Sequence, residues 1–141
     1  MNLKNIFTVH AVILLIYGIM DLFLTQNALS MFAEGVQASP TLVLTVRMMG
    51  ATFLSLAVLT WFMRDAHVSH GRRAGLFCLA VGLIIASILQ IMAITDGTIS
   101  NMNWIGVLIS TAFGVAYAYF GNKEHKMIME REAKERAKAK A

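Results

Sequence analysis

Residues 39–73 read SPTLVLTVRMMGATFLSLAVLTWFMRDAHVSHGRR, an apolar run that carries one arginine, Arg47, and ends in a basic turn. The 23 residues from 41 to 63 contain no other charge, and about 20 apolar residues are enough for a helix to cross a bilayer. Ser39 can accept a hydrogen bond from the first unpaired amides, and Pro40 stands where its missing N–H costs nothing. This stretch therefore predicts a membrane-spanning helix followed by a polar turn.

The composition places the whole chain in the integral membrane class. Of its 141 residues, 57% are hydrophobic and only 14% are charged, whereas soluble domains carry about 25% charged residues. The length suits one domain of about four spanning helices and leaves no room for a second. A single cysteine, Cys78, excludes an intramolecular disulfide and a cysteine-based metal site.

Three further apolar stretches predict spans, so we expect an all-α, four-helix membrane bundle over residues 1–120. Short polar or basic segments separate these stretches. Leu29, Met31 and Phe32, followed by Gly35, predict a short interfacial helix closed by the glycine. Asn101 or Asn103 is expected to cap the last span. The predicted spans are residues 6–24, 41–63, 74–94 and 104–120.

The first span also has features of a signal peptide. Lys4 precedes it, and Ala28 and Ser30 follow it with the spacing of a cleavage site. Asp21 is unusual inside a signal core, however, so we expect an uncleaved helix.

Positive charge alternates along the chain. Eleven of the twelve basic residues fall at Lys4, in the turn 64–73, or in the tail from Lys123 onward. Cytoplasmic segments are enriched in lysine and arginine, so this distribution predicts that both termini are cytoplasmic. It is a membrane-orientation signal and does not indicate nucleic-acid binding.

Residues 121–141, GNKEHKMIMEREAKERAKAKA, form a charged tail. Glu130 with Lys134, and Glu132 with Arg136, have the spacing of stabilising helical pairs, so we expect a cytoplasmic helix that could continue the last span. Seven basic and four acidic residues suit contact with anionic headgroups. A solvated tail and a protein-docking arm are the alternatives.

Asp21 and Arg47 are the most informative polar residues, because a charge inside a membrane normally faces a partner or a cavity. At ~1.5 Å per residue they lie about 5 and 10 Å below the outer surface. We therefore expect an ion pair, which Gln90, Ser110 and Thr111 join at similar depths to form one polar cluster from all four helices. The cluster could fix helix register, bind a lipid headgroup, quinone or small solute, or support proton-coupled transport. Transport is least favoured, because a paired aspartate stays ionised.

His10 lies at a depth similar to that of Tyr117 and Tyr119. No second intramembrane histidine exists to complete a heme or metal site, so we expect a hydrogen-bonded interfacial histidine. His67 and His70 could form a weak surface metal site with Asp65, but polar loop residues are favoured. We predict no metal and no cofactor. The residues expected at the membrane interface or in docking are Trp61, Arg64, Arg72, Arg73, Trp104, Tyr117 and Tyr119.

Small residues such as Gly50, Gly75 and Gly114 predict close helix packing. Together with Gly18 and Pro40, the runs RMMGA (47–51), WFMR (61–64) and RR (72–73) resemble a bacterial group of four-helix membrane proteins of unknown function, distantly similar to the DoxX family. The resemblance covers about residues 6–120. It implies a fold and a bacterial inner-membrane location but no activity.

The sequence does not bring a nucleophile, a base and an electrophile together. We therefore expect a non-catalytic accessory or structural subunit of a larger membrane complex. Its partners would be membrane lipids and other membrane subunits or itself, without nucleic acid. The alternative is a small transporter or a lipid-, quinone- or small-ligand-binding bundle centred on Asp21 and Arg47.

Overall fold

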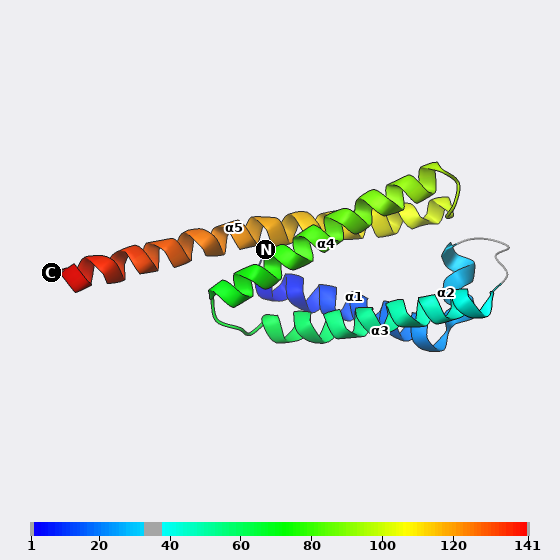
Figure 1. Cartoon of the computed structure of the whole chain (residues 1–141), viewed down its shortest axis with the longest axis horizontal. Helices are drawn as coiled ribbons and strands as arrows, with labels where there is room; N and C mark the ends of the chain where they lie inside the picture. Colours follow the sequence, from blue (N-terminus) through cyan, green and yellow to red (C-terminus); the bar gives the residue numbers. More distant parts are fainter. Residues whose placement is uncertain (1, 33–37, 141) are drawn as a thin grey trace.

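The computed structural model describes residues 2–32 and 38–140, and these form helices joined by short connections (Figure 1). The all-α prediction is confirmed, because the described residues contain no strand. Gly35, which we expected to close the short second helix, lies outside the described residues. The elements are α1 (Leu3–Phe23), α2 (Thr25–Phe32), α3 (Pro40–Met63), α4 (His70–Thr95), the 3₁₀ turn η1 (Asn101–Asn103) and α5 (Trp104–Lys140).

Four helices, α1, α3, α4 and the helix that contains α5, are long and apolar enough to cross a membrane, so this is a multi-pass membrane protein. The 21 to 26 residues of the first three give lengths of about 31–39 Å, which match a hydrocarbon core of about 30 Å. The 37 residues of α5 give about 55 Å. About 25 Å of α5 therefore lies beyond the thickness of such a core.

A serine side chain caps the N-terminus of three of these elements. The Ser39 hydroxyl accepts a hydrogen bond from the Leu42 amide at 3.2 Å, which confirms the predicted cap of α3. Ser69 caps α4 in the same way through the Arg72 amide. Ser100 caps η1 through the Met102 amide at 3.3 Å, and α5 continues from that turn. The expected cap of the last span by Asn101 or Asn103 stays a prediction.

The long helices form two antiparallel pairs, α1 with α3 and α4 with α5. Each pair is in close contact along its length, whereas contact between the pairs is sparse. The pairs diverge away from the end that carries the N-terminus, and α2 lies between them at the wide end (Figure 1). There α2 contacts α3 and η1.

One hydrophobic core joins the two pairs. It contains Phe7 of α1, Met63 of α3, Leu76 of α4 and Tyr117 of α5, so all four long helices meet in it. These residues lie close to Lys4, to the turn 64–69 and to the start of α4. We call this end of the molecule the basic end, defined by Lys4, Arg64, Arg72 and Arg73.

Candidate functional site

Asp21 and Arg47 do not pair, and the prediction of an ion pair between them is wrong. Asp21 is 1% exposed, whereas Arg47 is exposed and forms no ion pair with any described residue. Val46 and Gly50 form the buried face of α3 at this level, and Arg47 follows Val46 by about 100° around the helix. Similar depth did not place the two side chains on facing surfaces.

Asp21 instead packs on a close crossing of α1 and α3. A Cβ atom added to Gly50 would lie 2.9 Å from the Gly18 carbonyl oxygen and 2.9 Å from the Asp21 Cβ. A Cβ on Gly18 would lie 3.0 Å from the Gly50 carbonyl oxygen. The two backbones thus approach so closely that only glycine fits at either position.

A second polar group joins α4 to α5. The hydroxyls of Ser87 and Ser110 are 2.7 Å apart, and the Thr111 hydroxyl donates to Ser87 at 3.1 Å. Gln90 lies one turn further along α4 against Gly106, and its buried Oε1 has no hydrogen-bond partner. Sequence reasoning missed Ser87, although its position three residues before Gln90 places both on one face of the helix.

The predicted single cluster from all four helices is therefore wrong. Among the described residues, no hydrogen bond or ion pair connects Asp21 or Arg47 with Gln90, Ser110 or Thr111. Asp21 and Arg47 belong to the α1–α3 pair and the other three to the α4–α5 pair. Because the pairs diverge at this level, two separate polar groups result (Figure 1).

At the basic end, α1 meets α5 through a buried histidine and tyrosine. The His10 Nδ1 and the Tyr117 hydroxyl are 2.7 Å apart, and the His10 ring stacks on Phe113 with centroids 4.5 Å apart. His10 thus has a hydrogen-bond partner, as expected. Tyr117 is completely buried, however, so it is a core residue and not the membrane-interface or docking residue that we expected.

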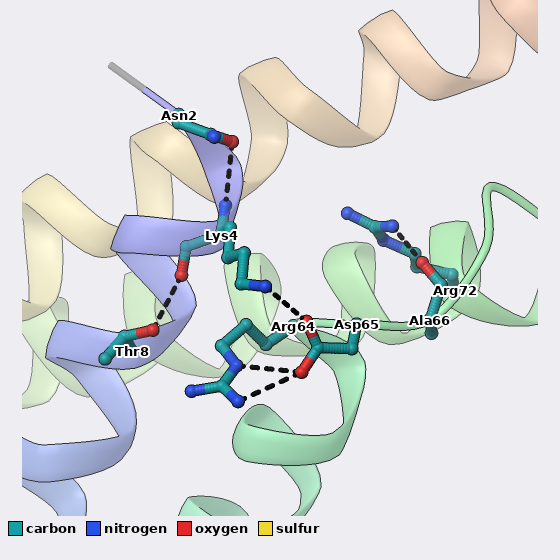
Figure 2. Close-up of polar contacts among 7 residues, drawn as sticks. All are labelled: Asn2, Lys4, Thr8, Arg64, Asp65, Ala66 and Arg72. Carbon is teal, nitrogen blue, oxygen red and sulfur yellow. Dashed lines mark hydrogen bonds and ion pairs between the residues drawn. The ribbon is translucent and has the colours of Figure 1, made fainter.

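Arg72 and Glu124 form an ion pair in the interior of the basic end. The Arg72 Nε lies 3.1 Å from the Glu124 Oε1, and the two side chains are 12% and 3% exposed. The guanidinium also lies 5.8 Å from the Phe7 ring centroid and donates to the Ala66 carbonyl oxygen (Figure 2). Arg72 therefore connects α4, α5, α1 and the α3–α4 turn, and is not a free docking residue. Sequence reasoning missed Glu124, the first acid of the tail.

Lys4 and Arg64 converge on one carboxylate at the surface (Figure 2). The Lys4 Nζ lies 2.7 Å from one Asp65 oxygen, and the Arg64 Nη2 lies 3.0 Å from the other. The hydrogen bond from Lys4 has the largest effect and the one from Arg64 the next largest, and together they hold the pKa of Asp65 below its ordinary value. Arg64 also stacks on Trp61 at 3.9 Å. The N-terminus of α1 is thus tied to the end of α3.

Of the remaining predicted interface residues, three are exposed and Arg73 is partly buried. Trp61, Trp104 and Tyr119 are exposed, as an interfacial position requires. Arg73 lies 5.5 Å above the Phe77 ring on α4.

Within the part of the chain that the structure describes, His67 of the α3–α4 turn and His70 of α4 belong to no candidate metal site. The His70 Nε2 lies 3.0 Å from the Glu132 Oε1 on α5. The described part of the chain contains no group of three or more histidine, cysteine, aspartate or glutamate side chains that could hold a metal ion.

An apolar groove runs between α1 and α3 on the outer surface. Its volume is about 210 Å³. Trp61, which stacks on the Arg64 guanidinium, lies at the end of the groove that is nearer to the basic end of the molecule. The groove is lined by Ala11, Val12, Leu15, Ala57, Val58, Trp61 and Phe62.

Comparison of the chain with protein-family models, curated proteins and solved structures gives no match.

Proposed function

We propose that this protein is a non-catalytic accessory subunit of a larger complex in the bacterial inner membrane, with both termini in the cytoplasm. The observation that carries the proposal is α5, which continues without a break from the membrane span into a charged arm. The resemblance to DoxX-like proteins supports the bacterial location, and the arm supports the role as a subunit.

Contacts with α4 brace the first part of the arm. Arg72 pairs with Glu124, His70 pairs with Glu132, and Ile128 between them is 7% exposed. These contacts fix the direction in which α5 leaves the membrane. A surface held in one direction is preorganised for a partner, which lowers the entropy cost of association.

The end of the arm carries charge of both signs. Beyond Glu132, the side chains of Lys134, Glu135, Arg136 and Lys138 are exposed. Anionic headgroups alone would favour a uniformly basic surface. The acid Glu135 among the cations Lys134, Arg136 and Lys138 favours a protein partner with complementary charges, because such patterns select partner and register.

The orientation of the basic end supports a cytoplasmic arm. Lys4, Arg64, Arg72, Arg73 and the tail all belong to this end, and such clusters remain on the cytoplasmic side. Reporter fusions at residue 141 and in the 96–100 connection test this part of the proposal. A periplasmic signal from the first fusion would contradict it.

The experiment that tests the subunit role is gentle detergent extraction from native membranes, followed by native mass spectrometry and an absorption spectrum of the same fraction. A photocrosslinking residue at Lys134 should join the protein to one larger partner. The matched position is Leu108, which is 69% exposed near the start of the α5 span and should give lipid adducts. Recovery as a monomer or small homo-oligomer, without a partner crosslink from Lys134, would refute the role.

Lipid binding is a second candidate, favoured by the apolar groove between α1 and α3. An acyl chain in the groove would place its headgroup near Arg64 and Lys4, whose two positive charges share one carboxylate, Asp65, among the described residues. Val58, 56% exposed, lines the groove, so Val58→Trp should remove lipid that remains bound in native mass spectra. Val81→Trp, at a 55% exposed site on α4, is the control, and equal lipid retention in both variants would exclude the groove.

A further inference from the structure

Asp21 forms no ion pair with any residue that the structure describes. The side chain is 1% exposed, and its Oδ2 atom has no hydrogen-bond partner. The nearby Thr25 hydroxyl donates to the Asp21 backbone carbonyl oxygen at 2.7 Å, so it serves the main chain. Within the described residues, therefore, no hydroxyl group donates to the buried Oδ2 atom.

The elements packed around Asp21 bring no compensating cation. In α2, residues 25–32 are uncharged, and Arg47 is the only charged residue of α3. Arg47 is exposed and forms no ion pair with the described residues. On α1 itself the other charged residue is Lys4, which lies about 25 Å away along the helix and binds Asp65.

A carboxylate without a counter-ion or hydrogen bonds is costly in such surroundings, and the group avoids that cost by taking up a proton. We infer that Asp21 is a proton-binding site within the membrane. In the folded protein at neutral pH its carboxylate oxygen has bound one proton from solution, and the side chain is a neutral acid. This inference goes beyond the proposed subunit role and does not depend on it.

The location of this site gives the bound proton a structural consequence. Asp21 packs on the Gly18–Gly50 crossing, where neither helix has space for another atom. Loss of the proton would create a charge at that crossing, and its solvation would require α1 and α3 to separate there. The crossing is thus closed with the proton bound and loosened without it.

The chain allows a selective test, because its aspartates are Asp21, Asp65 and Asp96 alone. A double variant with Asp65→Asn and Asp96→Asn changes two loop residues and leaves Asp21 as the only aspartate. Infrared spectra of this variant, purified and labelled with isotopic aspartate, should show the labelled C=O band of a protonated acid at neutral pH. Labelled carboxylate bands without the acid band would overturn the inference, and this readout does not require an Asp21 variant to fold.

A second measurement connects the proton to the crossing. Asp21→Asn keeps the size of the side chain and cannot ionise. Between neutral and alkaline pH the unmodified protein should lose thermal stability, and Asp21→Asn should lose less, while Asp96→Asn follows the unmodified protein. Equal losses in all three proteins would overturn the link between Asp21 and the crossing.

Discussion

The Tyr117 hydroxyl lies 2.7 Å from the His10 Nδ1, and this contact ties α5 of one helix pair to α1 of the other. Both side chains are buried, at 0% and 3% exposed. Within the described residues it is the one hydrogen bond between these two helices. It lies in the core that unites the pairs, so its loss should weaken the junction directly.

Tyr117→Phe keeps the ring and removes the hydroxyl, which leaves the buried His10 nitrogen without a partner. We expect a loss of about 1–3 kcal/mol in unfolding free energy, the cost of an unsatisfied buried polar group. Denaturant titration of the detergent-solubilised protein measures it. Tyr119→Phe, at a 64% exposed site, is the control, and equal effects of the two substitutions would contradict the structure.

The Gly18–Gly50 crossing predicts a different sensitivity for two helical glycines. Gly50→Ala places a methyl group 2.9 Å from both the Gly18 carbonyl oxygen and the Asp21 Cβ, so overpacking should cost about 1–3 kcal/mol. Gly82→Ala on α4 meets nothing within 4 Å and should not destabilise the protein. The melting temperatures of both variants measure the difference. If Gly50→Ala is as stable as Gly82→Ala, the close crossing is wrong.

The ion pair between Arg72 and Glu124 should be much more important than the exposed pair further along the tail. Arg72→Gln leaves a carboxylate that is only 3% exposed, and breaking a buried pair costs about 3–5 kcal/mol. Adding Glu124→Gln should restore part of the stability, because the unpaired charge disappears. A double-mutant cycle measures this coupling.

Arg136→Gln provides the matched comparison for that cycle. Its pair with Glu132 spans 3.9 Å with the arginine 81% exposed, so its loss should cost less than about 1 kcal/mol. Similar losses for Arg72→Gln and Arg136→Gln would show that the interior pair is not formed.

The contacts of Asp65 predict an acid-sensitive connection between α1 and the α3–α4 turn. Hydrogen bonds from Lys4 and Arg64 lower the pKa of Asp65, so the folded state favours its ionised form. Its contribution to stability is present above the ordinary aspartate pKa and disappears as the pH falls through the lowered value. Asp65→Asn should therefore be slightly less stable than the unmodified protein at neutral pH.

The difference for Asp65→Asn should vanish in strong acid and shrink in high salt, because the carboxylate is exposed and screened. Thermal unfolding over a range of pH and salt concentrations measures both trends. A difference that persists in strong acid would show that the Asp65 charge is not its cause.

The sequence predicted less of the polar sites than of the helices. The depth of Asp21 and Arg47 followed from residue counts, but depth leaves the direction around each helix open. Arg47 follows the buried Val46 by about 100° and faces outward. In the same way, tyrosine is typical of membrane interfaces, yet the packing of α1 against α5 buries Tyr117 completely.

The sequence by itself determined the all-α class, the spanning helices, the start of α3 at Ser39 and the collection of cations at one end. These properties depend on hydropathy, caps and charge along a single chain, which local physics fixes. Only the tertiary structure decided that the pairs unite around Phe7 and Tyr117 and diverge beyond them. It alone decided that Arg72 meets Glu124 and that Asp21 is without a cation. In a membrane, lipid-facing and helix-facing surfaces are equally apolar, so composition does not determine which helix packs against which. Close backbone approach and polar contacts between helices determine it.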